Sequence, residues 1–352
     1  MIIGLLGKCG SKSKMNKLFF SICMPIYNSE SMLKDTIKSI LNQTFTNYEV
    51  IVSDNCSNDN SEEVVKSFND ARLKYYKNEC NVGYAKNLEL CLERASGDII
   101  YLMSAKSKLS KYALERTYNA FLLAEDVGAV ARHYYWYGDS IQQPVRAKSI
   151  QTQDEDLVLS INDDADKIMA VFKTLDNPAG LAYRKKYMDM MFHRDPFVEF
   201  TYPFASILKK HKVVLLKGYN MACPAKEYSG SQNSAVYEKS PMQSWIDLFN
   251  EVFSEKEFEN LRNRCIKEFV ATNYIGLVQV RNYARKYSYL LREIGMLLKY
   301  RWQNIYNPSF WFFSLGTMIL PRSILIPAVA FYKDKINSRI VKSNIKDIGL
   351  EV

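Results

Sequence analysis

The sequence predicts an α/β protein organised around a parallel sheet in its N-terminal part. Residues 18–24 are apolar and β-prone, and this run stops at the turn-forming segment 25–28. A helical pattern follows, and then a second strand, 48–52, ends in the polar loop 53–59. This order and spacing of strand, turn, helix and strand is typical of a βα unit of a parallel sheet. Ligands bind at the carboxyl ends of such strands, so both polar loops are candidate binding loops.

The next segments continue the alternation of helices and strands. The first helix has one apolar face, formed by Met32, Leu33, Ile37, Ile40 and Leu41. Beyond the second strand, the pattern predicts a helix over 61–68, a strand over 72–77, a helix over 85–95 and a strand over 98–103. This last strand is expected at the centre of the sheet, because its residues are apolar on both faces.

Further along, the pattern predicts fewer strands and one long loop. We expect a helix over 109–124, a strand over 127–135, a helix from 164, a strand over 177–183, a helix over 202–210 and a strand over 212–217. Residues 139–163 are polar and lack periodicity, so they are expected to form a variable loop. From residue 241 the pattern is helical, with helices over 241–253, over 255–273 and on to about residue 300.

The composition is that of a globular protein in a reducing compartment. Of the 352 residues, 47% are hydrophobic and 24% are charged, which is enough apolar material for a large core and excludes a disordered chain. The seven cysteines include no CxxC pair, which favours reduced thiols and a cytosolic location. The three histidines are too dispersed to predict a zinc site. Residues 1–14 lack a clear cleavage site and are expected to be a disordered extension before a natural start at Met15.

The C-terminal part combines an apolar stretch with a strong positive charge. From Arg281 onward there are 12 Lys and Arg against 4 Asp and Glu, a net charge of +8. Residues 309–332 are apolar and long enough to span a bilayer, but Arg322 lies in the middle, where a charge costs at least ~2.5 kcal/mol. We therefore expect two short helices that dip into one leaflet, anchored by Trp302 and Trp311 and by lysines such as Lys333 and Lys335.

Other interpretations of this region stay open. The apolar stretch would equally suit a buried helical hairpin that packs on the rest of the protein. The basic residues would suit anionic lipid head groups, each interaction gaining roughly 1 kcal/mol, or an ordinary solvated surface. Nucleic acid is not expected as a partner, because no motif that recognises it accompanies the charge.

Four segments of the N-terminal part contain short motifs: Pro25-Ile26-Tyr27-Asn28 followed by Ser39–Thr44, then Ser53–Asp59, Asn81–Asn87 and Ala95–Ile100. In this order and spacing they resemble the motifs of family 2 glycosyltransferases with the GT-A fold. The second, Ser53–Asp59, is similar to the family's V-D-D-G-S-T-D loop. The third and fourth, Asn81–Asn87 and Ala95–Ile100, resemble its N-x-G…R-N stretch and its A-x-G-D/E-Y-I strand. The resemblance extends over about residues 18–240 and fades beyond them.

This resemblance implies how the chain is divided. A GT-A domain, an α/β mixed sheet with flanking helices, is expected over 15–240, with a donor part over 18–107 and an acceptor part over 108–240. A helical extension is expected over 241–306, and a membrane-associating apolar and basic tail over 307–352.

The resemblance also implies which residues hold the nucleotide-sugar donor. The candidates are Pro25, Tyr27, Asn28, Asp54, Asn55, Lys86 and Ser104. Tyr27 can offer an aromatic face to the base, and Asp54 can accept hydrogen bonds from the base or ribose, unless it only caps a turn. Lys86 stands where the family has arginine near the phosphates, and lysine keeps the charge but loses the bidentate fork.

The family's DxD motif, which holds Mg²⁺ or Mn²⁺ against the diphosphate, is absent from its expected position. The segment reads Ser104-Ala105-Lys106-Ser107-Lys108, without a carboxylate, whereas hard cations prefer carboxylate oxygens. No metal ligand is therefore assigned. In one hypothesis Lys106, helped by Lys108 and Lys86, replaces the metal's positive charge. In the other, catalysis is lost and the chain acts as a binding or scaffolding subunit.

An inverting transfer needs a carboxylate to take the proton of the acceptor hydroxyl. The candidates are Asp195 and Glu199, and Glu199 lies nearer the position of the family's acidic pair. Both would also suit a helix start, where the dipole favours acids. His193 is a weaker candidate. A loop that covers the acceptor is expected to include Tyr228, Ser231 and Gln232.

The expected function is transfer of a sugar from a nucleotide-diphospho-sugar to a growing surface glycan, carried on a polyprenyl or other lipid. The glycan is implied by the resemblance, and the lipid by the C-terminal region. The expected location is the cytoplasmic face of the cell membrane, bound peripherally.

Overall fold

The computed structural model describes residues 18–147, 155–192, 195–225 and 234–331. The predictions for residues 1–14, Met15, His193, the loop with Tyr228, Ser231 and Gln232, and the lysines beyond 331 lie outside these ranges.

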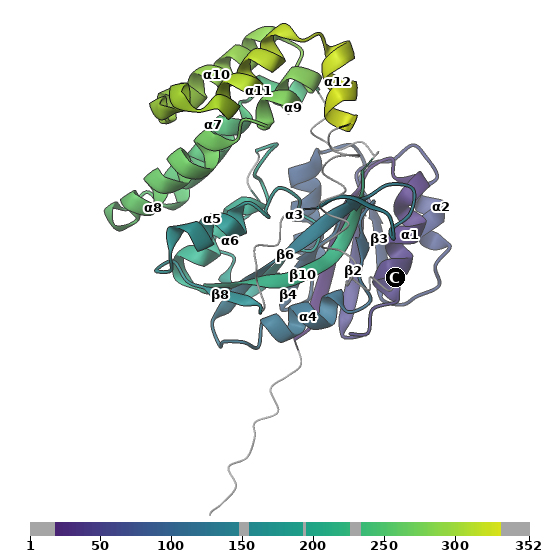
Figure 1. The fold of residues 1–352 in the computed structure, drawn as a ribbon. Helices are drawn as coiled ribbons and strands as arrows, with labels where there is room; N and C mark the ends of the chain where they lie inside the picture. The colour runs from purple at the N-terminus through teal and green to yellow at the C-terminus, as the bar shows by residue number, and fades with distance from the viewer. Residues whose placement is uncertain (1–17, 148–154, 193–194, 226–233, 332–352) are drawn as a thin grey trace, which may run out of the picture.

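A mixed sheet forms the centre of the molecule (Figure 1). Its strands run in the order β3-β2-β1-β4-β9-β6-β10-β5 within the described residues. The donor half consists of β1 (Phe20–Ile26), β2 (Tyr48–Asp54), β3 (Leu73–Lys77) and β4 (Ile99–Leu102), in which neighbouring strands are parallel. The expected parallel sheet and the central position of the fourth strand are therefore confirmed.

The other half of the sheet mixes directions. It contains β9 (Ala182–Arg184), β6 (Val127–Tyr137), β10 (Lys212–Pro224) and β5 (Lys108–Leu109). Strand β9 is antiparallel to both β4 and β6, whereas β6 and β10 are parallel to each other. The short strand β9, antiparallel to both of its neighbours, thus joins a donor half and an acceptor half into one sheet.

Helices cover both faces of the sheet because successive strand residues point to opposite sides. In β1, Ile22 and Met24 join one core cluster and Cys23 the other. The first cluster lies beneath α1 (Glu30–Leu41), α2 (Ser61–Lys66) and α4 (Ala113–Ala120). The second lies beneath α3 (Tyr84–Arg94), α5 (Ala165–Phe172) and α6 (Thr201–Lys210).

Two predicted elements differ in the structure. The helix expected from residue 109 begins at Ala113, because Leu109 is fully buried in β5 and pairs with Met221 of β10. The expected loop 139–163 contains two strands, β7 (Pro144–Ala147), which pairs with β6, and β8 (Leu157–Leu159), which pairs with β10. Strand β7 forms a hairpin with the preceding β6, whereas β8 pairs with a strand far away in the sequence, which local periodicity does not record.

Three other predicted elements also have different boundaries in the structure. Strands β6 and β10 run past the expected residues 135 and 217, since they pair with each other along most of their length. The expected strand over 177–183 is regular only from Ala182. The helix expected over 255–273 is broken into α8 (Glu259–Arg264), a π-helical turn over Cys265–Phe269 and a 3-10 turn over Val270–Thr272.

The C-terminal helices form a second layer beside the sheet, drawn in green and yellow at the top of Figure 1. They are α7 (Pro241–Val252), α8, α9 (Gly276–Tyr283), α10 (Tyr287–Tyr300), α11 (Pro308–Ile319) and α12 (Arg322–Phe331). The apolar cluster beneath α3 and α6 continues through Phe249 of α7 and Leu297 of α10 to Phe310 of α11. Among the described helices, none is both long and apolar enough to cross a membrane.

Candidate active site

Three loops meet where parallel strands end at one edge of the sheet. Strands β1, β2 and β4 finish at Ile26, Asp54 and Leu102, and the loops that follow are tied to one another. The Asn28 amide donates to Ser57 Oγ at 2.9 Å, and the Asn58 amide donates to Asn28 Oδ1 at 3.0 Å. The Thr36 hydroxyl donates to the Ala105 carbonyl at 2.8 Å, which ties α1 to the loop after β4.

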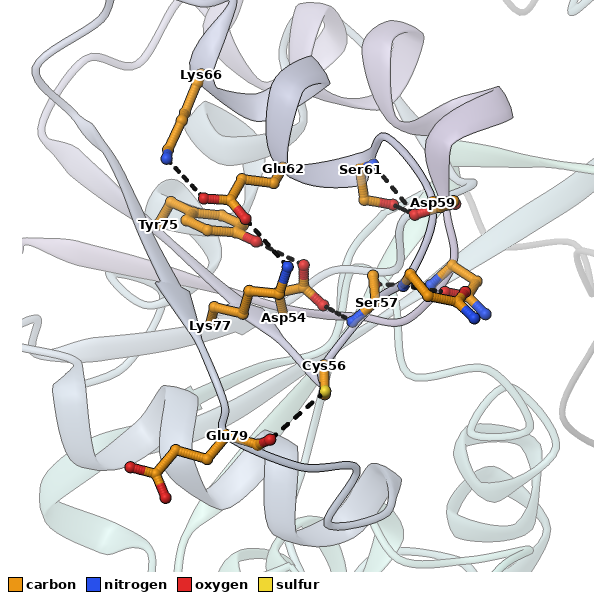
Figure 2. Close-up of polar contacts among 12 residues, drawn as sticks. Asp54, Cys56, Ser57, Asp59, Ser61, Glu62, Lys66, Tyr75, Lys77 and Glu79 are labelled. Atoms are coloured by element: carbon orange, nitrogen blue, oxygen red, sulfur yellow. Dashed lines mark hydrogen bonds and ion pairs between the residues drawn. The ribbon is translucent and has the colours of Figure 1, made fainter.

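Two non-glycine residues in these loops adopt left-handed backbone conformations, Asn28 with φ 46° and Cys56 with φ 65°. Asn28 tolerates this region, but for most other L-residues it costs roughly 1–2 kcal/mol. Cys56 stands at the glycine position of the V-D-D-G-S-T-D loop, and its Sγ lies 3.6 Å from the Glu79 carbonyl oxygen (Figure 2). The loop thus keeps a glycine-like shape without its glycine.

Asp54 shapes the loop that carries it (Figure 2). Its side chain is fully buried, with Oδ1 accepting from the Ser57 amide at 2.8 Å and Oδ2 from the Tyr75 hydroxyl at 2.6 Å. Burial and this hydrogen bond raise the pKa of Tyr75, so the phenol stays protonated and donates. These contacts match the alternative of a turn-capping aspartate, and its contact with base or ribose stays a prediction.

Asn55 belongs to a network of amides rather than pointing into open space. Its Oδ1 accepts from the Val82 amide at 2.9 Å, and its Nδ2 donates to Asn81 Oδ1 at 2.8 Å. Asn87 in α3 bonds both Ser53 and Asn78. The network joins the loop after β2 to the start of α3.

Among the remaining donor candidates, exposure differs. Pro25 is buried in β1, whereas Tyr27 and Asn28 are exposed beyond its end. Lys86 lies 3.4 Å from both Glu89 and Glu93 of its own helix, so two carboxylates already balance its charge. Tyr27 and Asn28 are thus the donor candidates whose side chains are open to a ligand.

The loop after β4 contains hydroxyls, a thiol and cations. Ser104 Oγ is 2.7 Å from Ser107 Oγ, which is 3.3 Å from Cys223 Sγ of β10. Lys108 donates to Asp35 at 2.8 Å, so its charge is also paired. Lys106 lies close enough for its charge to act on Cys223, whose pKa burial raises.

This donor set does not suit the Mg²⁺ or Mn²⁺ that the family resemblance implies. Hard divalent cations take carboxylate, carbonyl and water oxygens, and neighbouring ammonium groups repel them. Across the described ranges, no three His, Cys, Asp or Glu side chains come together as a possible metal site.

Asp195 and Glu199 occupy different environments although they are only four positions apart in the sequence. Asp195 is fully buried, its Oδ1 accepts from the Phe197 amide at 2.9 Å, and its Oδ2 lies 2.5 Å from Lys239 Nζ. Glu199 is 8% exposed, and no described residue forms a hydrogen bond or ion pair with its carboxylate. Burial, and secondarily the charge of Asp195, raises the pKa of Glu199 to about 8.

Two further residues belong to this region and were not expected from the sequence. Tyr84 at the start of α3 is 40% exposed as a whole residue, while desolvation of its phenol, and secondarily the charge of Glu199, raises the pKa of that group. Arg132 of β6 is buried and donates to the carbonyls of Thr174, Asn177 and Ala179. A lone arginine in an apolar strand and a tyrosine after a glycine carry no local signal of these roles.

This architecture defines the class of protein. A parallel donor half, a mixed acceptor half and helices on both faces form the GT-A fold of nucleotide-diphospho-sugar transferases. The fold of S. aureus TarS, residues 1–349 in complex with UDP, superimposes with a TM-score of 0.60 at 17% identity, covering 94% of this chain and 91% of that one.

Within this class, residues 21–182 match the family model described as glycosyl transferase family 2. This part of the chain is therefore a family 2 glycosyltransferase domain, as its motifs indicate.

Relatives of known sequence match about a third of this chain or less. An uncharacterized glycosyltransferase of Haemophilus influenzae is 36% identical over 110 residues, which is 31% of this chain and 44% of the relative. The UDP-Glc:alpha-D-GlcNAc-diphosphoundecaprenol beta-1,3-glucosyltransferase WfgD of Escherichia coli is 37% identical over 91 residues, 26% of this chain and 36% of the relative. The chain thus matches less than half the length of these curated relatives.

Proposed function

We propose that the protein is a glycosyltransferase that moves a sugar from a nucleotide-diphospho-sugar to a hydroxyl of a growing glycan. The observation that carries this proposal is Glu199. It is an enclosed carboxylate that no described group pairs with, and its pKa of about 8 suits a general base. It lies in the half of the chain that is expected to bind the acceptor, beyond residues 21–182, which match the family 2 model.

In the proposed reaction the acceptor hydroxyl oxygen attacks the anomeric carbon of the donor sugar. Its proton passes to the Glu199 carboxylate, the bond from the anomeric carbon to the phosphate oxygen breaks, and the nucleoside diphosphate leaves with the electron pair. Lys106, in the loop after β4, supplies a fixed positive charge to the departing diphosphate. Asp195 holds the segment before α6 through Lys239 and the backbone, so it acts as a positioning residue.

The acceptor in this proposal is a glycan linked to a polyprenyl or similar lipid. Support comes from the relatives' names, since WfgD and a Campylobacter jejuni relative are both named for undecaprenol-linked acceptors. Support for work at the cytoplasmic face of the membrane comes from the net charge of +8 carried by residues 281–352 and the apolar stretch 309–332.

One observation favours a second candidate function. The loop 104–108 lacks carboxylates, and Lys86 and Lys108 pair with acidic neighbours. A homologue that has lost catalysis and serves as a binding or scaffolding subunit would also have this loop.

Calorimetric titration with uridine, guanosine and thymidine diphosphates, each with Mn²⁺ and with a chelator, separates the alternatives. An affinity that is the same with Mn²⁺ and with the chelator supports a metal-independent transferase, and the preferred base identifies the donor class. Binding that requires Mn²⁺ refutes the role of Lys106 as the metal's replacement. Absence of binding under both conditions favours the inactive homologue.

The role of Lys106 has its own test. Lys106→Ala is expected to lower the transfer rate by roughly 10²-fold or more, the scale of removing one transition-state charge contact, with an unchanged melting temperature. Lys108→Ala is the matched control, because its ammonium bonds Asp35, and it is expected to affect transfer much less. Equal rates for wild type and Lys106→Ala would refute the assignment.

A further inference from the structure

Each of the last two described helices, α11 and α12, exposes large apolar side chains. We call these side chains together the apolar hairpin face and define it by Trp311, Phe312, Leu315, Ile319, Ile324 and Phe331. All six are exposed, and they lie on α11 and α12, which Figure 1 shows at the edge of the helical layer. Several large apolar side chains exposed on consecutive helices are typical of an interaction site.

Helix α11 has the opposite orientation to that of a helix on the surface of a water-soluble protein. The polar side chains Ser314 and Thr317 are each 1% exposed, whereas Phe312 is 73% and Ile319 is 72% exposed. Phe312, Leu315 and Ile319 follow one another at helical spacing, so they share one face. The helix therefore turns Phe310 and its small polar side chains to the protein, and Phe312, Leu315 and Ile319 outward.

The charge in the middle of the apolar stretch lies on the protein side. The Arg322 guanidinium donates to the carbonyls of Arg281 at 2.9 Å and Ala284 at 2.6 Å, at the end of α9. Arg281 Nε in turn donates to the Thr317 carbonyl at 2.9 Å, and the Tyr287 hydroxyl donates to the Met318 carbonyl at 3.1 Å. These polar bonds hold the hairpin to α9 and α10 without using its apolar face.

The chemistry around this face matches an anionic lipid surface. Residues 294–332 contain no Asp or Glu, while the chain from Arg281 onward carries a net charge of +8. Trp302 and Tyr306, just before α11, are exposed aromatic rings with polar groups, the type that gathers at membrane–water interfaces. No described helix is long enough to cross a bilayer, which leaves a position within one leaflet.

We propose that α11 and α12 lie in the plane of an anionic bilayer, with the apolar hairpin face inserted among the acyl chains and Arg322 turned to the protein. This deepens the membrane association in the proposed function by naming the inserting residues. Vesicle binding needs neither donor nor acceptor, so its outcome is independent of whether sugar transfer occurs.

The test is flotation of the full chain with vesicles of phosphatidylglycerol and phosphatidylcholine, and with phosphatidylcholine alone. Wild type is expected to float with the anionic vesicles, less so as salt rises. Phe312→Ser and Ile319→Ser should each lower the partition coefficient roughly tenfold or more. Leu123→Ser, at another exposed apolar position outside this face, is the matched control and should bind as wild type.

Fluorescence and self-association complete the test. Emission of Trp302 and Trp311 is expected to shift to shorter wavelength with anionic vesicles, and brominated acyl chains should quench it. Wild-type vesicle binding by both serine variants, with melting temperatures unchanged, would overturn the proposal. So would a wild-type dimer that the same substitutions convert to a monomer while no form binds vesicles, since the face would then contact a second copy.

Discussion

Asp195 and Glu199 show how the surroundings of a residue set its chemistry. Both are carboxylates before α6. The charge of Asp195 is balanced by Lys239 and by hydrogen bonds from backbone amides, whereas Glu199 is buried and no described residue balances its charge. Burial disfavours the charged form, so Glu199 holds its proton to about pH 8.

Glu199→Gln is expected to abolish transfer and to stabilise the fold. The folded-state pKa of about 8 exceeds the ordinary 4.5, so native Glu199 binds more protons than the unfolded chain between these values. Its contribution to stability is therefore present below pH 4.5 and is lost as pH rises to 8, by up to about 5 kcal/mol at 1.4 kcal/mol per pKa unit. The glutamine variant should melt above wild type at pH 9 and near it at pH 5.

Asp195→Asn is the contrasting variant. It leaves Lys239 without its close partner, and we expect a lower melting temperature at neutral pH. Thermal unfolding of both variants across this pH range checks the pair, and a stabilised Asp195→Asn or a destabilised Glu199→Gln at pH 9 would contradict the assignment. In wild type, the transfer rate should rise with pH towards about 8, as the base loses its proton.

Cys56 has a backbone conformation that glycine adopts without strain. Cys56→Gly removes the left-handed strain at φ 65° but adds freedom to the unfolded chain, so a net stabilisation of up to about 1 kcal/mol is expected. Asn28→Gly is the control, because the Asn28 side chain accepts from the Asn58 amide and its loss should cancel any gain. Denaturant unfolding measures both, and a clear loss of stability in Cys56→Gly would contradict the interpretation.

At the scale of elements, the close contact between the turn before β4 and the start of β1 requires a glycine at position 97. The turn before β4 lies against the start of β1, where the Gly97 amide donates to Ser21 Oγ at 2.8 Å. A Cβ at Gly97 would lie 2.6 Å from the Ser21 backbone nitrogen and 2.7 Å from the Phe19 carbonyl oxygen. Backbone atoms cannot move aside as a flexible side chain can.

Gly97→Ala is therefore expected to destabilise the protein by roughly 2 kcal/mol or more, the range of strained core substitutions. Gly295→Ala in α10 is the matched control, since nothing lies within 4 Å of its added Cβ and alanine favours helices by about 0.5–1 kcal/mol. Thermal unfolding of the two variants should shift in opposite directions, and equal shifts would contradict the argument.

At the scale of the molecule, the C-terminal helices and the sheet share one apolar core. Phe249 of α7 contacts Phe172 of α5 with ring centroids 5.0 Å apart, and the same cluster includes Leu181 beside β9. Arg264 of α8 also pairs with Asp166 of α5 at 3.0 Å. The helices after residue 240 therefore share one apolar core with the sheet, across the domain boundary that the sequence predicted at residue 240.

A chain ending at residue 240 is expected to lose cooperative folding, because it exposes the cluster around Phe172. Size-exclusion chromatography and thermal unfolding by circular dichroism should show aggregation or a broad transition at lower temperature. A truncation at residue 306, which keeps α7 to α10, should retain a cooperative transition. A sharp, wild-type transition in the chain ending at 240 would show that the two parts fold independently.

Local patterns in the sequence were sufficient for the donor half of the fold. Alternating apolar runs and turns predict β1 to β4 and their helices, since these parallel strands follow one another along the chain with little interruption. The candidate loops could be found for the same reason, because each directly follows a strand.

Long-range contacts decided the rest. Strands β5 and β8 pair with β10, which lies far away in the sequence, and β7 pairs with the preceding strand β6. The difference between Asp195 and Glu199 depends on Lys239 and on burial, neither of which is encoded in their own neighbourhood. In the sequence, Arg322 is a charge within an apolar stretch. In the structure it donates hydrogen bonds to carbonyls at the end of α9, and these partners depend on the tertiary fold.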